Sequence, residues 1–322
     1  MAALKRLEPD FFADFRCIAG RCTDSCCIGW EIDVDEETLE QYENLPGELG
    51  EELRRSIVRE EDAAHFALGE GERCPFLDGH NLCRVITALG EGALCGICRE
   101  HPRFYEWFGS RVEAGLGLCC EEACRLLLDS DRPLNFVETE DGAPDEPFDG
   151  APELLRALEH VRERAYAILQ DRSRPFFDRL RGFLTCLTAV QDELDGFPPA
   201  QEAMQAELPD EDALLALCRR MEPMNDDWPH LVARMETPGT PADAPDWVYE
   251  RAAVYLTYRW LLKAAFDGDV LGKAMLVTAF LCLLRRLLDS GTVSSAAEGL
   301  RLLSRQIEYS EVNTEIVERM DL

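Results

Sequence analysis

The sequence predicts a mainly α-helical protein, in which a cysteine-rich N-terminal unit with a small β-hairpin is followed by an α-helical bundle. Two observations support this fold class. Eleven of the 14 cysteines lie between Cys17 and Cys124, whereas apolar side chains recur at helical spacing from Pro152 onward. With 322 residues, of which 46% are hydrophobic, the chain is long enough for two domains that each bury a core.

Residues 1–137 form the expected cysteine-rich, metal-binding unit. Asp35 is a good N-cap for a helix over residues 36–45. Leucine and isoleucine then repeat every four residues, which predicts a second helix over residues 48–60. Residues 106–113 turn at a Gly-Ser pair between apolar and polar residues, and this pattern predicts a small hairpin.

The second half of the chain is expected to form helices after a linker. Residues 138–152 are acidic and rich in proline and glycine, so they are the expected linker to an α-helical domain over residues 153–322. Residues 225–246 show little periodicity and are expected to form a long loop. The expected helices cover residues 154–169, 176–194, 211–221, 246–266 and 270–288. A Ser295-x2-Glu298 capping box predicts the start of one more helix, the last of the chain.

The spacing of the cysteines indicates a bound metal rather than disulfide bonds. The first ten residues hold no apolar segment of a signal peptide, so we expect a reducing, cytoplasmic location. The region holds an odd number of cysteines, and adjacent ones such as Cys26 and Cys27 bridge each other poorly. Cys95-x2-Cys98 lets two thiolates reach one ion from a single turn of chain, as in zinc and iron–sulfur sites.

The kind of metal stays open on the residues alone, because zinc and iron–sulfur clusters both accept four thiolates. Zinc sites often include histidine, but His80 and His101 form no closely spaced pair. Cys74-Pro75 is similar to the Cys-Pro that ends ferredoxin motifs. The remaining cysteines lie in helical apolar patterns and are expected to be core residues: Cys186, Cys218 and Cys282.

The charge of the chain restricts its partners. The formal net charge is −30, from 63 acidic and 33 basic residues. This charge repels nucleic acid and anionic membranes, so neither is expected as a partner. A cationic partner such as a lysine-bearing protein is attracted by the same field, while the simpler alternative is an acidic surface that keeps the protein soluble.

Several motifs occur together along the chain. They are Phe15-x-Cys17, Cys22-x3-Cys26-Cys27-x-Gly29-Trp30, Cys74-Pro75-Phe76-Leu77, Leu82-Cys83, Leu94-Cys95-x2-Cys98-Arg99, Pro102-Arg103-Phe104, Cys120-x-Glu122-Ala123-x-Arg125 and, near the C-terminus, Ser304-x2-Ile307-Glu308-x-Ser310-x2-Asn313. In this combination the chain resembles the bacterial flagellin lysine-N-methylases, within the wider group of proteins that carry a zinc- or iron-chelating cysteine motif.

The resemblance implies an S-adenosylmethionine-dependent protein-lysine N-methyltransferase that acts on flagellin lysines and holds a cysteine-bound [4Fe–4S] cluster. Arg99 and Arg103 are candidates for binding the carboxylate of the methyl donor, and Trp30 for an aromatic wall beside its sulfonium. The implied metal ligands are Cys17, Cys22, Cys26, Cys27, Cys74, Cys83, Cys95, Cys98 and Cys120.

The residues themselves show no methyl-donor site. No G-x-G-x-G turn joins a strand to a helix, and no Cys-x3-Cys-x2-Cys radical motif occurs. Catalytic residues stay unassigned, although a carboxylate or a tyrosine near the amine would serve as its proton acceptor. Three carboxylates in or beside the motifs are candidates: Glu31, Glu122 and Glu308.

The chain departs from the family pattern at four positions. Cys119, Glu121, Cys124 and Tyr309 stand where family members usually have serine, proline, alanine and histidine. The change at Tyr309 matters if the C-terminal motif meets the substrate. The alternative function is a zinc- or iron-binding interaction or electron-transfer protein without methylase activity.

Overall fold

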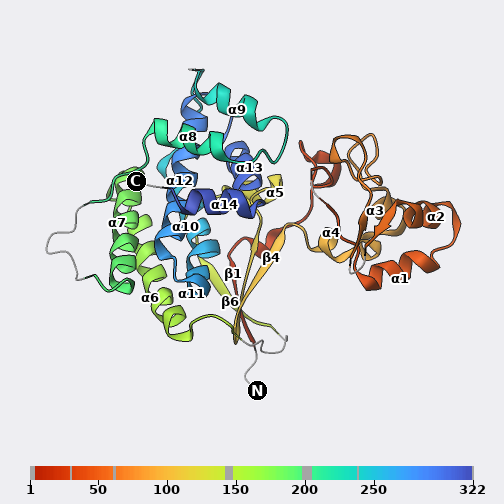
Figure 1. Cartoon of the computed structure of the whole chain (residues 1–322), viewed down its shortest axis with the longest axis horizontal. Helices are drawn as coiled ribbons and strands as arrows, with labels where there is room; N and C mark the ends of the chain where they lie inside the picture. Colours follow the sequence, from red (N-terminus) through yellow and green to blue (C-terminus); the bar gives the residue numbers. More distant parts are fainter. Residues whose placement is uncertain are drawn as a thin grey trace. The chain divides into compact units, whose positions relative to one another are not determined.

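The computed structural model describes residues 4–29, 31–60, 63–141, 148–197, 205–237 and 239–320 (Figure 1). Within them the fold is mainly α-helical with small sheets, as the sequence predicts. The chain divides into two compact units: a helical unit of Met1–Phe15, Tyr105–Cys119 and Ala123–Leu322, and a cysteine unit of Arg16–Phe104 and Cys120–Glu122. None of the described helices combines the length and apolar character that a membrane span requires.

A four-stranded sheet belongs largely to the helical unit, so the two units do not follow the expected boundaries at residues 137 and 153. Its strands, in spatial order, are β4 (Arg103–Phe108), β5 (Arg111–Leu116), β1 (Leu4–Pro9) and β6 (Phe136–Asp141). Strands β4 and β5 are the predicted hairpin. β1 runs parallel to β5 and antiparallel to β6, and the sequence pattern predicts neither β1 nor β6.

Two tyrosines of helix α10 (Asp246–Trp260) fasten the sheet to the helices. The Tyr255 hydroxyl accepts a hydrogen bond from Leu116 N and lies 2.6 Å from Leu116 O. The Tyr258 hydroxyl lies 2.6 Å from Leu7 O on β1 and 2.9 Å from a carbonyl oxygen of β5. Both rings are fully buried, and a buried phenol needs such partners for its hydroxyl.

Helix α12 (Val270–Asp289) is the centre of the bundle and contacts α7, α10, α13 and α14. It is buried on all sides between Gly272 and Leu284, as expected for a helix that is apolar around its circumference. The other helices of this unit are α6 (Pro152–Leu169), α7 (Phe176–Leu194), α8 (Glu211–Arg220), α9 (Trp228–Met235), α11 (Ala264–Asp267), α13 (Ala296–Ile307) and α14 (Glu311–Glu318), while α5 (Glu121–Leu127) spans the boundary.

One expectation about the helical unit is wrong. Residues 225–246, expected to form a long loop, contain helix α9. Pro229 lies in its first turn, where the missing N–H costs no intrahelical bond. Trp228, Val232 and Met235 are buried at the spacing of one helical face. The prolines near this short segment hide its periodicity in the sequence.

A buried ion pair joins the sheet to helix α6. Both carboxylate oxygens of Glu113 on β5 lie 2.7 Å from guanidinium nitrogens of Arg162. The two side chains are only 3% and 4% exposed. Arg111 also pairs with Glu113, at 2.9 Å. Such a pair is costly to break, because removing one partner leaves the other charge buried and uncompensated.

The cysteine unit is built from short elements. They are α1 (Glu36–Asn44), α2 (Gly47–Ser56), β2 (Ile57–Arg59), β3 (Ala64–Phe66), α3 (Arg84–Leu89) and α4 (Gly96–Glu100). The Asp35 carboxylate accepts a hydrogen bond from Thr38 N at 2.9 Å, which confirms the predicted N-cap of α1. The helix expected over residues 48–60 ends at Ser56, because the next three residues pair with β3.

Candidate functional site

Five of the predicted metal ligands gather at the core of the cysteine unit. We call them the five-thiol cluster: Cys27, Cys74, Cys83, Cys95 and Cys98. Cys74 and Cys95 are buried members of this apolar core, and the other three are half-buried against it. Cysteines from four separate parts of the chain thus share one apolar core, which excludes most water.

Short turns of the backbone bring these thiols together. Cys74 N donates to Cys27 O at 2.9 Å, which joins the first cysteine segment to the second. Leu77 N bonds back to Cys74 O at 3.1 Å, and Leu77 also forms a β-bridge with Cys83. Cys95 is the N-cap residue of α4, and the Cys95-x2-Cys98 spacing places both sulfurs at this first turn.

The thiols of Cys95 and Cys98 share a hydrogen bond, and they ionise unequally. This bond lowers the pKa of Cys95, although burial opposes the effect. The same bond raises the pKa of Cys98, and burial and the neighbouring thiols raise it further. Burial also raises the pKa of Cys74 to about 11. Metal ligands are thiolates, so Cys74 and Cys98 would release protons on binding a metal.

Two further predicted ligands lie beside a carboxylate, which we call the Glu121 group. The Glu121 carboxylate accepts from Thr23 N at 2.8 Å and from the Cys22 thiol at 3.5 Å. Cys120 lies close enough to raise the pKa of Cys22, although burial is the largest cause of the shift to about 12. Glu121 is a departure from the family pattern, and here its side chain holds the segment that carries Cys22.

The last two predicted ligands are exposed. The Cys26 thiol shares a hydrogen bond with Cys27, and this bond is the largest cause of the raised pKa of Cys26. The Cys17 sulfur accepts from Ala19 N at 3.4 Å. The nine predicted ligands therefore do not form one group. Cys26 borders the five-thiol cluster, Cys22 and Cys120 belong to the Glu121 group, and Cys17 lies on the surface.

The donor set of the five-thiol cluster fits a metal that prefers sulfur. Among the residues that the structure describes, however, no three histidine, cysteine or acidic side chains converge on a point that could hold a metal ion. The thiols influence one another's ionisation, as for Cys98 with Cys27 and Cys74, without sharing such a point. The ligand set stays a prediction.

The two candidate donor-binding arginines lie on different elements. Arg99 is exposed on α4, and Arg103 is half-buried at the start of β4. Trp30 lies outside the described residues. Of the candidate bases, Glu31 is 63% exposed and lies 3.7 Å from His65, while Glu122 is buried at 6% exposure.

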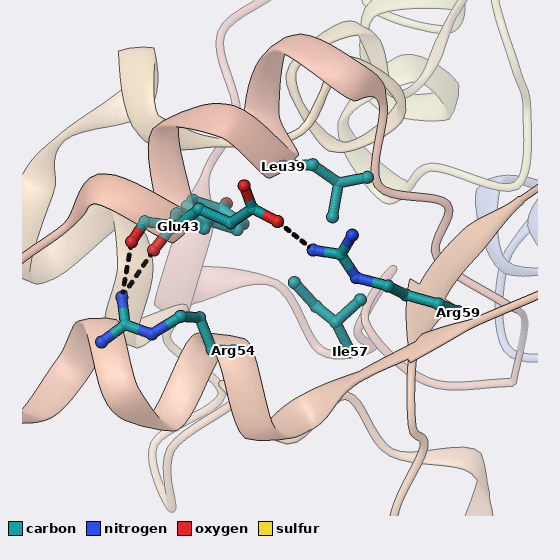
Figure 2. Close-up of a pocket in the computed structure, with 6 residues that line it drawn as sticks. Leu39, Glu43, Arg54, Ile57 and Arg59 are labelled. Carbon is teal, nitrogen blue, oxygen red and sulfur yellow. Dashed lines mark hydrogen bonds and ion pairs between the residues drawn. The ribbon is translucent and has the colours of Figure 1, made fainter.

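Figure 2 shows a small cavity in the cysteine unit, between α1, α2 and β2. Its volume is about 120 Å³, and it is lined by Leu39, Tyr42, Glu43, Arg54, Ile57 and Arg59. Arg54 donates to three carbonyl oxygens at the end of α1, and Arg59 pairs with Glu43. The cavity is smaller than the roughly 300–1,000 Å³ of small-molecule sites, so it does not suit a nucleoside-sized donor.

A second polar group, which we call the C-terminal cluster, lies in the helical unit. It consists of Cys119, Arg259, Trp260, Glu308 and Tyr309. Glu308 Oε1 accepts from Arg259 Nε at 2.8 Å and from Trp260 Nε1 at 2.9 Å. The Cys119 thiol lies 2.8 Å from the Tyr309 hydroxyl. Burial, and then the nearby Cys119, raises the pKa of Tyr309.

The C-terminal cluster brings together two departures from the family pattern, Cys119 and Tyr309. They lie 190 residues apart in the sequence, so no local pattern predicts their contact. Other residues of the C-terminal motif have a structural role, because Ser310 and Asn313 both bind Glu222. Cys124, a further departure, is a buried thiol that donates to Leu118 O at 2.9 Å.

Three curated proteins are similar to this chain. The flagellar biosynthetic protein FliU of Salmonella muenchen is 33% identical over 134 residues, which cover 38% of this chain and 78% of that protein. Lysine-N-methylases of Salmonella choleraesuis and Salmonella typhimurium are also 33% identical over 134 residues, but this match spans 33% of their own length. No family model matches the chain. No solved structure matches it either.

Proposed function

Since this chain belongs to the family of the flagellar biosynthetic protein FliU, we propose that it is an S-adenosylmethionine-dependent protein-lysine N-methyltransferase that acts on flagellin lysines. The observation that carries the proposal is the 33% identity to proteins named lysine-N-methylase. The net charge of −30 supports a lysine-bearing protein as the partner, because it attracts cationic surfaces.

We also propose that the five-thiol cluster provides the ligands of a [4Fe–4S] cluster. Such a cluster takes four thiolates, and the group offers five sulfurs around one apolar core. When bound, it would supply an iron atom able to coordinate the methyl donor, or else act as a structural crosslink. The chain's own residues exclude water there, and the hydrogen bond from Cys98 lowers the pKa of Cys95. The reduced thiols that this requires suit a cytoplasmic location.

Methyl transfer sets a requirement for the lysine itself. The attacking nitrogen must be neutral, whereas free lysine has a pKa of about 10.4. The enzyme must therefore orient the amine and receive or release its proton. Burial near aromatic and acidic side chains meets this requirement, since burial disfavours the charged amine and an acceptor takes the proton.

The test is methyl transfer from isotopically labelled S-adenosylmethionine to flagellin, followed by mass spectrometry of flagellin peptides. We expect label on flagellin lysines only when the chain and the methyl donor are both present. Methylation of the chain itself would add little background label, because the chain has only three lysines, Lys5, Lys263 and Lys273. Unlabelled flagellin after incubation with metal-replete protein would exclude the methylase and favour the binding or electron-transfer alternative.

A further inference from the structure

Three segments that are far apart in the sequence meet at the C-terminal cluster of the helical unit. Cys119 follows strand β5, Arg259 and Trp260 end helix α10, and Glu308 and Tyr309 connect α13 to α14. Each contact within the cluster links two of these segments. The cluster is therefore assembled by the tertiary fold and not by one local motif.

The cluster has a buried floor and an exposed rim. The Glu308 side chain is fully buried and that of Arg259 is 12% exposed, whereas Tyr309 is 38% exposed. Within the described residues the Tyr309 hydroxyl has one hydrogen-bond partner, the Cys119 thiol. A phenol oxygen can accept two hydrogen bonds, so a donor arriving from the surface finds an oxygen already oriented by Cys119.

The hydrogen bonding of Glu308 indicates which kind of group the cluster binds. Its Oε1 is satisfied by Arg259 and Trp260, but its Oε2 is buried with no hydrogen-bond partner among the described residues. A buried carboxylate oxygen without a donor is rare in proteins and calls for a water or a ligand that donates. An ammonium or amine is such a donor.

The surroundings already hold one ammonium group. Lys263 Nζ lies 5.1 Å from the centroid of the Trp260 ring and 2.6 Å from Glu106 Oε2. An aromatic face beside carboxylates is the combination that binds alkylammonium groups in proteins. The Trp260 indole also donates a hydrogen bond to Glu308, so this side chain connects the surroundings of Lys263 to the buried part of the C-terminal cluster.

We propose that Tyr309 binds the amine of the acceptor lysine, with Cys119 and Glu308 as positioning residues. This inference rests on the proposed methylase function. The lysine ammonium loses one proton to solvent, and the neutral Nζ donates a hydrogen bond to Tyr309 Oη. The nitrogen lone pair then attacks the methyl carbon of the sulfonium donor. The N–C bond forms as the S–C bond breaks, and sulfur keeps the electron pair as a neutral thioether.

The kinetic test compares Tyr309→Phe with Tyr105→Phe, which makes the same change at a half-buried tyrosine of strand β4 outside the cluster. We expect Tyr309→Phe to lower kcat for flagellin methylation about 100-fold, because phenylalanine cannot orient the amine and misplacing a reacting group costs roughly this much. Tyr105→Phe should keep the wild-type kcat and KM. Equal metal content and equal thermal unfolding in both variants would show that folding is not the cause.

A binding test does not depend on catalysis. N-α-acetyl-lysine amide, added to the wild-type protein, should slow alkylation of the Cys119 thiol by iodoacetamide, measured by peptide mass spectrometry. The same probe should give no protection in Tyr309→Phe. Wild-type kinetics in Tyr309→Phe, or no protection of Cys119 by the probe, would overturn the inference even if flagellin is methylated. Protection of Cys119 without flagellin methylation would instead sink the proposed function alone.

Discussion

The five-thiol cluster and the C-terminal cluster differ in how their polar atoms are satisfied. In the first, sulfur atoms have one another and an apolar core as neighbours, and the hydrogen bond between Cys95 and Cys98 lowers the pKa of Cys95. In the second, Glu308 Oε1 pairs with Arg259 and accepts a hydrogen bond from the Trp260 indole. The first region offers sulfur donors for the proposed metal, whereas the second holds ion and hydrogen-bond pairs of its own and leaves Glu308 Oε2 without a hydrogen-bond partner among the described residues.

The two units also differ in the size of their cores. Among the described residues, the core of the cysteine unit is one cluster of eleven buried residues, and two of these are cysteines. The helical unit instead surrounds α12, which is buried on all sides between Gly272 and Leu284. A small unit buries little apolar surface, so the proposed metal would contribute a larger share of its folding free energy.

The largest effect is expected for Cys95→Ser and Cys98→Ser. Each removes a sulfur from the five-thiol cluster, and with it the metal and the folding free energy that metal binding supplies. We expect loss of bound metal and rapid backbone hydrogen exchange across Arg16–Phe104, while exchange in α12 stays slow. Cys186→Ser is the matched control, since this thiol lies on α7 in the helical unit. Full metal content in both cluster variants would show that Cys95 and Cys98 are not metal ligands.

The next largest effect is expected in the helical unit, for Glu113→Ala. Removing this carboxylate leaves Arg162 buried without a countercharge, which costs about 3–5 kcal/mol of unfolding free energy. Chemical denaturation should detect the loss in the helical unit with the metal content unchanged. Glu138→Ala is the control, because its pair with Lys5 is exposed and contributes less than about 1 kcal/mol. Equal stabilities for both variants would contradict the account.

A pH effect of intermediate size is expected from His101 in the cysteine unit. Burial lowers the pKa of this imidazole from 6.5 to about 4. The unfolded chain therefore binds the proton more readily, so the contribution of His101 to stability is complete above pH 6.5 and is lost as the pH falls toward 4. The loss amounts to at most about 3 kcal/mol. His101→Asn should flatten this part of the stability profile, and an unchanged profile would show that the imidazole is not buried.

The smallest effect is expected for two thiols of the helical unit. Cys282→Ala removes a buried sulfur from α12, and Cys186→Ser changes a half-buried one on α7 that accepts a hydrogen bond from Arg164. Each should cost about 1 kcal/mol, because only local contacts are changed. Thermal unfolding measures the cost, and metal analysis should show no change. A loss of metal in either variant would mean that the helical unit contributes a ligand.

The fold could be predicted from the sequence wherever one element carries its own signal. The apolar repeat of α6 and the N-cap at Asp35 are local patterns, and the structure confirms both. Strands β1 and β6 are different, because β1 becomes recognisable only when it pairs with β5 about 100 residues later. The prolines near α9 likewise hide a helix that its buried face stabilises.

In the candidate site, too, the sequence predicts contacts between residues close in the chain but not contacts made by the tertiary fold. The cysteine spacing identifies Cys95 and Cys98 as neighbours, because both lie at one turn. It does not reveal that Cys22 joins Glu121 or that Cys119 meets Tyr309, since these contacts depend on the tertiary fold. Sequence patterns thus predict a type of chemistry that stays a prediction, while the grouping of the residues required the structure.

Metal analysis of the wild-type chain, purified without oxygen, tests most directly whether the cysteine unit is completed by a metal. We predict iron together with acid-labile sulfide, bound by the five-thiol cluster and absent from Cys98→Ser. Stoichiometric zinc without iron would keep the thiolate site but reject the iron–sulfur cluster. A fully folded cysteine unit with no metal at all would contradict the central difference between the two regions.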